Sequence, residues 1–552
     1  MKQTTFCTPL EVKPDSCSRL IAVIERMRAA EDGGHAGAPE NFARLKRDVP
    51  TLHFMSMSVF PASEFDPTLI FEANIDGAPG VFWGQLEAAF GERLREVLRC
   101  CKRPLDEDGP LYDAVTAAQS RAPVAAYFEA RTHQPSVFHH GNRGMTRDRI
   151  LREDELFAAV RLQIDRPGRT GPSSYRGIGA VDVHGKLRRE LLPDFGWLND
   201  PAETRISAAE HIADGVRMFA FVAAVLLVLA TPGLALAAIF TSSWFLLLYM
   251  ALAIAVIALT AYLKRKPLAG AEVDTHFNPI PGLLKNAGMI AGFLVAYLGA
   301  AILLLTPIVL ASRWVLARLG IAPGLSFDAA WRSVAVASLW GLVGIAVSAG
   351  LLLLWLRYLE RRDSSHDAPS IDEPVLREMV RREDWIAQNH MGSIVIVKPG
   401  VLRTIIIRVG HLGLGLLLRF TAMNGYLGSM RTVHFAHWAF LNNGSRLLFL
   451  SNFDHSWDSY LDDFIEKASV GLTLAWGCGI GFPPTRFAIL DGAKHGRQFK
   501  NWALASRAVS RFWYSAYREL TVDQIERNNR IADGLRKPEL GETEAATWIR
   551  NL

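Results

Sequence analysis

The sequence predicts an α+β protein that is interrupted by a membrane insertion. The first observation is an internal repeat, because Thr51-Leu52-His53-Phe54 and Thr432-Val433-His434-Phe435 open two similar stretches. The second is the concentration of apolar residues in 218–356, which accounts for a mean hydropathy of +0.14. A duplicated unit of roughly 100 residues has the size of a domain. The chain between the two copies is therefore interpreted as an insertion, most of it in a membrane.

The two copies stay similar well beyond their opening motifs. The matching pairs are Asn74 and Asn452, Asp76 and Asp454, Phe82 and Tyr460, Leu86 and Phe464, Thr146 and Thr521, and Asp148 and Asp523. In the second copy, 433–441 and 446–452 have strand character around an Asn-Asn-Gly turn, and 458–467 has a helical apolar face. The full order of two strands, helix, strand, helix and strand is close to a ferredoxin-like unit. We expect two such units to form a pseudo-dimeric α+β barrel.

Four apolar stretches are each long enough to cross a bilayer, which takes about 20 residues. They lie at about 216–230, 243–263, 287–310 and 334–356. Apart from Arg217 at the start of the first, they contain no Lys, Arg, Asp or Glu. Because intramembrane ionisable groups mark proton relays and ion paths, their absence argues against those functions.

Basic residues set the expected orientation of these spans. They precede the first span, follow the fourth and lie in the central loop, 264–285. The positive-inside rule then places both termini and both soluble repeats in the cytoplasm, on a bacterial inner membrane. The N-terminus lacks the apolar region of a signal peptide, which agrees with this expectation. A fifth apolar run, 404–420, is expected as an interfacial amphipathic helix, or as an ordinary surface helix of the second repeat.

The predicted organisation therefore has five parts. They are an N-terminal extension (1–50), the first repeat with a connecting helix (51–200), the four-helix membrane insertion (201–362), a linker with the amphipathic helix (363–431), and the second repeat with a C-terminal helix (432–552).

Composition and missing motifs narrow the function classes. The net charge of +5 over 552 residues is compatible with an anionic membrane surface and gives no support to nucleic-acid binding. The five cysteines form no CxxC pair and have no histidine at zinc spacing, so no metal site is expected. The sequence also contains no Walker A loop, Gly-x-Ser-x-Gly elbow, His-Glu-x-x-His helix or Rossmann fingerprint.

The duplicated histidines, His53 and His434, open equivalent strands. Histidine suits axial haem ligation or proton transfer. The alternative is a structural histidine at the sheet edge. Duplication favours this alternative, because both halves of a fold need such a residue, whereas a haem needs its ligand once.

Asp76 and Asp454 each follow a strand and precede a helix. A carboxylate at this place caps the helix or fixes the turn, or it lines the barrel mouth as an acid–base group. His455 beside Asp454, and His437 on the same side of its strand as Phe435, occur only in the second copy. We therefore predict His437, Asp454 and His455 as the catalytic candidates.

The polar segment Gln388-Asn389-His390 leads into an apolar strand at 394–397 and has no counterpart in the first copy by sequence. It is interpreted as the mouth of a pocket, or else as a polar loop. Together with His53 and His434, these three residues form the predicted cofactor-binding set.

The runs Val433-His434-Phe435-Ala436-His437-Trp438 and Ser451-Asn452-Phe453-Asp454 resemble bacterial multi-pass membrane proteins. Those proteins are similar in fold pattern to the dimeric α+β-barrel superfamily, which includes the haem-binding dye-decolourising peroxidases and chlorite dismutases. The resemblance covers both repeats. The peroxidases' Gly-x-x-Asp-Gly motif is not matched, since Ala73-Asn74-Ile75-Asp76-Gly77 lacks its first glycine, so no haem-ligand position carries over.

This resemblance implies a membrane-tethered oxidoreductase, haem-dependent and peroxidase-like, that acts on an apolar or lipid-derived substrate at the cytoplasmic face. The alternative is a non-catalytic membrane protein whose α+β barrel binds a lipid or protein partner, or organises an assembly. The expected partners are the lipid bilayer and a lipid or apolar small molecule, without nucleic acid. The sequence leaves a homo-oligomer open.

Overall fold

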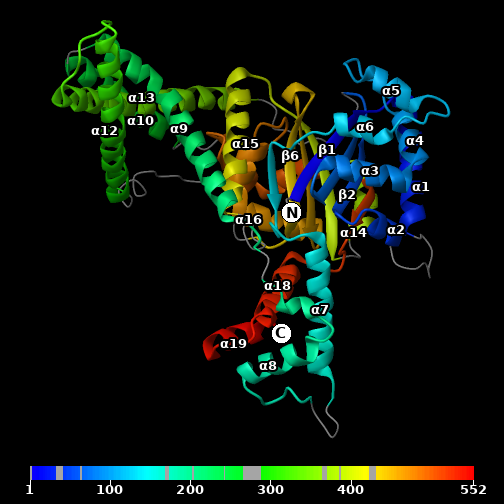
Figure 1. Cartoon of the computed structure of the whole chain (residues 1–552). Helices are drawn as coiled ribbons and strands as arrows, with labels where there is room; N and C mark the ends of the chain where they lie inside the picture. The colour runs from blue at the N-terminus through cyan, green and yellow to red at the C-terminus, as the bar shows by residue number, and fades with distance from the viewer. Residues whose placement is uncertain are drawn as a thin grey trace. The chain divides into compact units, whose positions relative to one another are not determined.

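The chain is a mixed α/β protein that carries long apolar helices (Figure 1). The computed structural model describes residues 3–32, 42–61, 65–167, 173–201, 204–240, 243–264, 287–363, 370–383, 387–421 and 430–552. It divides into two compact units. The first comprises Met1–Asp214, Asp367–Gly481 and Gly496–Leu552, and the second comprises Gly215–His366 and Phe482–His495.

The first sheet of the first unit is antiparallel and has the strand order β1-β3-β2-β11. Its strands are β1 (Gln3–Glu11), β3 (Thr68–Asp76), β2 (Leu52–Phe60) and β11 (Ser510–Ser515). β1 pairs with β3 along its whole length, and α1 (Cys17–Asp32) follows it. Residues 1–50, expected as an extension, thus supply the first strand and helix of the first copy.

The second sheet is antiparallel too, with the order β10-β5-β7-β6-β4. Its strands are β10 (Arg507–Ala508), β5 (Gln388–Ile396), β7 (Arg446–Asp454), β6 (Val433–Leu441) and β4 (Val137–His140). β5 lies inside the sheet, so part of the expected linker, 363–431, belongs to the second copy's sheet. The strands β1, β2 and β3 therefore correspond to β5, β6 and β7.

Each sheet also receives one strand from the other copy. β11, from the end of the second copy, pairs with β2, and β4, from the first copy, pairs with β6. The chain just before each exchanged strand stays with its own copy, since β10 pairs with β5 and His133 forms a bridge to Cys7 in β1. The exchanged strands thus cover the edges of β2 and β6, which would otherwise be open to pairing with another molecule.

Alternation along β3 separates two cores. Phe71 faces outward and packs on Trp83 of α3 (Pro79–Phe90), with ring centroids 4.9 Å apart. Ile70 faces the second sheet and joins a buried apolar cluster with Leu448 and Leu450 of β7. Glu72 and Asn74 share the face of Ile70, so polar groups enter the layer between the sheets.

The helices that follow the exchanged strands are α7 (Arg147–Asp165) and α18 (Val522–Arg536), which pack on each other. The matching threonines have the same role, since Thr146 caps α7 and Thr521 caps α18 in a capping box. A further apolar core joins them to α8 (Ala180–Leu191) and α19 (Glu542–Trp548).

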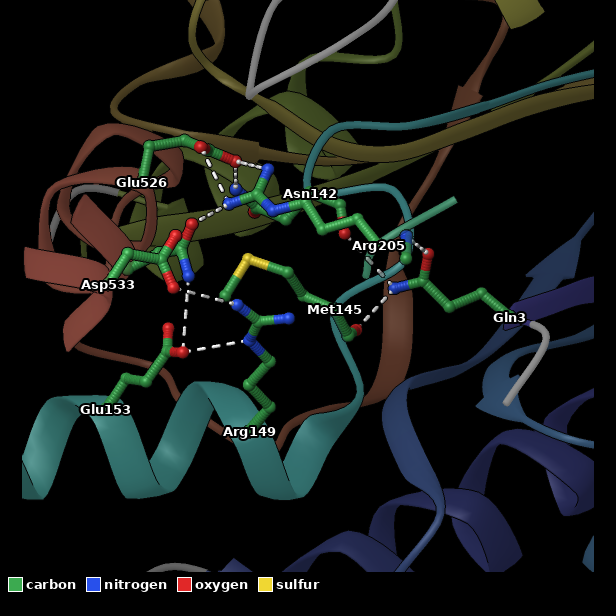
Figure 2. A network of polar contacts seen from close by, with 10 residues as sticks. Gln3, Asn142, Met145, Arg149, Glu153, Arg205, Glu526 and Asp533 are labelled. Atoms are coloured by element: carbon green, nitrogen blue, oxygen red, sulfur yellow. Dashed lines mark hydrogen bonds and ion pairs between the residues drawn. The ribbon is translucent and has the colours of Figure 1, made fainter. Parts of the chain in front are cut away.

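A polar network fixes the junction of α7 and α18 (Figure 2). Arg205 pairs with Glu526 of α18 through two contacts of 2.9 Å, and Asn142 donates to the same carboxylate at 2.8 Å. Arg149 of α7 contacts Glu153 at 2.8 Å. These charges all have partners, so the network is interpreted as structural.

Four helices in the described ranges are long and apolar enough to cross a membrane, which indicates a membrane protein. They are α9 (Ala208–Ile239), Tyr297–Arg318 within α12 (Ala287–Arg318), α13 (Phe327–Arg361) and α15 (Val401–Thr421). α10 (Ser243–Lys264), predicted as a full span, has a shorter apolar stretch, Trp244–Thr260. The central loop used for orientation lies, after Lys264, outside the described residues.

The first span is longer than the sequence pattern predicts. α9 continues through Pro232 to Ile239, whereas the prediction ended at residue 230. Gly233 allows a close approach to α13, because an added Cβ would lie 2.0 Å from the carbonyl oxygen of Trp340. Small residues at such a crossing are typical of helices in membranes, where neighbouring helices compensate for an internal proline.

α15 qualifies as a span by length and composition alone, yet it packs on the second sheet. His411 on its inner face contacts Ser136 Oγ at 3.1 Å and the carbonyl oxygen of Ala475 at 3.1 Å. Val401, Ile405 and other apolar side chains on its outer face are exposed. Because one face of α15 packs on the second sheet and the other is apolar and exposed, an interfacial helix stays the prediction.

In the second unit, the C-terminal end of α13 holds a hairpin of the second copy. Glu360 accepts hydrogen bonds from the backbone N–H groups of Phe487 and Ala488, at 2.9 and 2.8 Å, and from Thr485 Oγ1 at 2.9 Å. Arg357 pairs with Glu360 at 3.1 Å. Phe487 and Ala488 have φ angles of 56° and 58°, a conformation that costs energy without such support.

Glu360→Ala is expected to release this hairpin, because two backbone N–H groups lose their acceptor and Arg357 loses its buried partner. We expect a stability loss of about 3 kcal/mol and much faster proteolysis within 482–495. Limited proteolysis with mass spectrometry measures the second effect. The exposed Glu373 supplies the control, Glu373→Ala, which should leave cleavage unchanged, and equal cleavage in both variants would contradict the clamp.

Candidate functional site

The duplicated histidines sit in matching irregularities of the two sheets. The pairing of β2 with β3 shifts register between Leu52 and Phe54, and β6 with β7 shifts between Val433 and Phe435. His53 and His434 are therefore the extra residues of two β-bulges, which redirect a side chain out of the regular pattern.

Each redirected histidine meets the duplicated aspartate of its own copy. His53 Nε2 lies 3.1 Å from Asp76 Oδ2, and His434 Nε2 lies 2.7 Å from Asp454 Oδ1. The aspartates also accept backbone N–H groups at the start of the helices after the exchanged strands, from Arg147 at 2.8 Å and Val522 at 2.9 Å. A carboxylate is favoured at a helix N-terminus. The capped helices are thus α7 and α18 rather than the helices that directly follow the aspartates.

The two histidines do not fit the expected haem-ligand role in this conformation. Both rings are buried, and His53 Nδ1 lies 2.9 Å from the hydroxyl of Tyr517. Phe435 and Phe54 pack against His53 and His434, with centroids 5.4 and 5.3 Å apart. An axial ligand needs an open approach to a ring nitrogen, and these rings are enclosed.

Gln388 has a counterpart in the first copy, contrary to the sequence expectation. Gln3 pairs with Asp76 in β3, just as Gln388 pairs with Asp454 in β7. Gln388 donates to the carbonyl oxygen of Tyr517 at 3.0 Å, in the turn before α18. Gln3 holds the turn before α7 in the same way (Figure 2). Gln388 therefore has a structural contact in this fold.

The remaining predicted residues do not converge on one point. Asn389 donates to the carbonyl oxygen of His455 at 2.7 Å, and His455 itself is an exposed turn residue with a φ of 68°. Asp454 contacts His434 and accepts a backbone N–H group at the start of α18. His390 and His437, in contrast, both approach one carboxylate that the sequence analysis did not single out.

That carboxylate is Glu72 of β3, which is completely buried between the sheets. His390 Nε2 lies 2.9 Å from Oε2, and His437 Nδ1 lies 3.5 Å from Oε1. Ser56 donates to Oε2 at 3.1 Å, and Asn74 donates to Oε1 at 3.1 Å. Asn452, the duplicate of Asn74, contacts Oε1 at 3.4 Å. Five side chains from both copies thus surround one charge.

These contacts keep Glu72 ionised. Burial alone would raise its pKa, but the hydrogen bond from His390, the electrostatic contributions of His390 and His437 and the hydrogen bond from Asn74 together outweigh burial and lower the pKa to about 2. Burial lowers the pKa of His437 to about 4, so that ring is neutral at neutral pH. The charge of Glu72 is therefore held chiefly through His390.

His390 connects this buried charge to an open pocket. Its Nδ1 lies 2.5 Å from Ser510 Oγ, where β11 begins. Ser510 is half-buried, and Ser510, His390 and Trp513 line a cavity of about 250 Å³. The pocket thus ends at the chain of contacts Ser510–His390–Glu72.

The walls of this cavity, which we call the arginine pocket, are basic. Five arginines face two acidic residues, the lining charges being Arg28, Arg381, Arg382, Arg507 and Arg518 against Asp32 and Glu383. All five guanidinium groups form ion pairs, and three of them, Arg28, Arg381 and Arg382, do so with Glu25 or Glu378 outside the lining. An excess of positive charge in a concave site attracts anions.

A second cavity, of about 220 Å³, adjoins the first. The two share Met379, Arg507, Ala508 and Val509 as lining residues. The second cavity, which we call the apolar groove after its hydrophobic side chains such as Phe60, Leu376 and Ile394, is also lined by Asp372, Arg507 and Arg511. Helix α14 (Glu373–Glu383) contributes residues to both cavities.

Sequence reasoning missed Glu72, Ser510 and the arginines. Glu72 did carry a signal, since a lone carboxylate in the apolar strand Leu69-Ile70-Phe71 marks a buried charge that needs partners. Ser510 and the arginines come from separate segments and carry no local pattern. Comparisons with protein-family models, with curated proteins and with solved structures found no match.

Acidification is expected to destabilise the domain through its buried histidines. Burial lowers the pKa values of His139 and His437 to about 4, whereas unfolded histidine has a pKa of about 6.5. As pH falls from about 6.5 to 4, the unfolded chain binds protons that the folded chain does not, so stability is lost, by up to about 1.4 kcal/mol per pH unit for each histidine. Glu72 adds a further loss from about pH 4.5 to 2.

Melting temperatures of the detergent-solubilised protein between pH 7 and 4.5 measure this loss. His437→Gln should flatten the pH dependence, because one of the titrating groups is gone. The exposed His211 gives the matched control, His211→Gln, which should keep the wild-type slope. A melting temperature that rises on acidification would show that these rings are charged in the folded state.

Proposed function

We propose that this chain is a membrane-tethered protein whose duplicated domain binds an anionic amphiphile, a molecule with an acidic head and an apolar tail. We further propose that the two copies are ferredoxin-like units closed into one α+β barrel. The strand orders and the mutual exchange of β4 and β11 support this architecture. On the basic-residue pattern, the barrel faces the cytoplasm at an inner membrane.

The arginine pocket is the observation that carries the proposal. Arginine guanidinium groups match the planar geometry of carboxylate and phosphate groups, and they stay charged at any physiological pH. The ion pairs that orient Arg382 and Arg507 reduce the ordering cost of binding. His390 and Trp513 at the base of the pocket add a polar and an aromatic contact.

The apolar groove supports the amphiphilic character of the ligand. It begins where the arginine pocket ends, at Met379 and Val509, so an acidic head in one cavity leaves its tail in the other. Each buried CH₂ group contributes about 0.8 kcal/mol. Together the two cavities reach the volume range of ordinary ligand sites, which is about 300–1,000 Å³.

The haem-dependent oxidoreductase implied by the resemblance stays a prediction. Among the described residues, the cavities beside His390 are small, and the rings of His53 and His434 are enclosed. No observation favours the oxidoreductase over ligand binding. A Soret band in the purified protein would favour the oxidoreductase instead.

Binding of dodecyl phosphate to the purified full-length protein in nanodiscs tests the arginine pocket. We expect binding by isothermal titration calorimetry, and at least tenfold weaker binding, about 1.4 kcal/mol, after Arg382→Gln. The exposed Arg497 gives the control, Arg497→Gln, which should bind as the wild type does. Dodecanol, which has the same tail without the charge, should bind far more weakly.

Two results would contradict the proposal. Equal affinity for dodecyl phosphate and dodecanol would show that the arginines do not recognise the head. Equal weakening by Arg382→Gln and Arg497→Gln would show that the effect is one of net charge rather than of the pocket.

A further inference from the structure

Three side chains at the base of the arginine pocket form a continuous chain of contacts. Ser510 Oγ lies 2.5 Å from His390 Nδ1, and His390 Nε2 lies 2.9 Å from Glu72 Oε2. A hydroxyl, a base within hydrogen-bond reach and a third group that orients the base are the parts of an activated nucleophile. The three come from β11, β5 and β3, so both copies contribute.

The exposure of the three groups suits this role. Glu72 and the ring of His390 are shielded from water, whereas Ser510 is half-buried and lines the cavity. A register shift between Ser510 and Phe512 breaks the regular pairing of β11 with β2 at this position. Such bulges occur next to active sites, where they aim a side chain.

The electrostatics fix the roles of the two ring nitrogens. An ionised carboxylate can only accept, so His390 Nε2–H donates to Glu72, and in the neutral ring this leaves Nδ1 as the acceptor for the Ser510 hydroxyl. In addition, Arg382 Nη1 lies 3.4 Å from the backbone carbonyl oxygen of Ser510. This guanidinium, which also pairs with Glu25 and Glu378, therefore lies next to the residue that carries the nucleophile.

The position related to this one by the duplication lacks the same combination. The counterpart of His390 is Thr5, because Thr5 pairs with Asn74 as His390 pairs with Asn452. The counterpart of Glu72 is Leu450, because Leu450 pairs with Gly392 as Glu72 pairs with Cys7. Neither the base nor the acid is therefore duplicated. A feature present at one end only of a duplicated fold is not required by the fold itself.

We propose that Ser510, His390 and Glu72 form a nucleophilic triad that hydrolyses an ester or thioester of an acidic, long-chain substrate. This inference rests on the proposed function, because the arginine pocket and the apolar groove supply the substrate site. Ser510 and His390 are the catalytic residues, and Glu72 is a positioning residue.

The reaction needs no cofactor. Ser510 Oγ attacks the acyl carbon and gives its proton to His390 Nδ1, while the carbonyl electrons move onto oxygen. The tetrahedral intermediate collapses, the bond to the leaving oxygen or sulfur breaks, and the leaving group takes the proton from Nδ1. Water then attacks the acyl–serine, passing a proton to Nδ1, and collapse releases the carboxylic acid and returns the proton to Ser510.

A fluorophosphonate probe tests the nucleophile directly in the full-length protein, because it labels activated serines only. We expect one labelled peptide, containing Ser510, and its loss in Ser510→Ala. The exposed Ser445 gives the control, Ser445→Ala, which should label as the wild type does. Melting temperatures establish that Ser510→Ala is folded, since it removes one half-buried hydroxyl.

Hydrolysis of p-nitrophenyl dodecanoate then separates the roles. Ser510→Ala and His390→Gln should each lower kcat at least 100-fold. Glu72→Gln should lower kcat and change its pH profile, and Glu72→Asp should recover part of the rate, which a merely structural role would not produce.

The outcomes distinguish the two proposals. Dodecyl phosphate binding without labelling of Ser510 would overturn the triad and leave the binding function standing. Labelling of Ser510 without selective binding of dodecyl phosphate would overturn the binding function instead. Equal labelling of Ser510 in wild type and His390→Gln would show that the serine is not activated by this ring.

Discussion

Each sheet of this protein is complete only when the other copy supplies a strand, and the rest of the structure depends on this exchange. An isolated copy would present the unpaired edge of β2 or β6 and would lack the cover of the exchanged strand. The helices that follow, α7 and α18, start from the crossing strands and pack on each other. The two copies therefore form one folding unit. A long insertion between them is tolerable, because the entropy cost of closing a loop grows only slowly with its length.

Duplication and asymmetry separate structural residues from chemical ones in this fold. The bulge histidines, the aspartates that cap α7 and α18, and the glutamines of the first strands each have the same contacts in both halves. A fold assembled from two like halves needs them twice. Glu72 and His390 occur once, and they meet beside the arginine pocket, which His390 lines.

The sequence was informative where one residue has the same local structural role, such as capping a helix, in both copies. The capping role of Thr521 and the long apolar helices were predictable from local residue patterns, and the matching Thr146 caps α7 in the same way. β1 was missed because it shares little more than Gln3 with its counterpart, and strand pairing tolerates such divergence. The exchange was missed for another reason: Ser58 and Ser510, which pair across it, are 452 positions apart, and no local pattern indicates which distant strands pair.

The buried charge of Glu72 is the clearest argument that the inter-sheet layer is more than a core. An ionised carboxylate without partners would cost several kcal/mol there, and even a well-paired one contributes little net stability. Leu450 occupies the equivalent position of the second copy and packs in the apolar cluster of the same layer. The fold therefore accepts a hydrophobic residue at this place. What the charge provides, and leucine cannot, is a fixed proton on His390 and an acceptor aimed at Ser510, at the base of the arginine pocket.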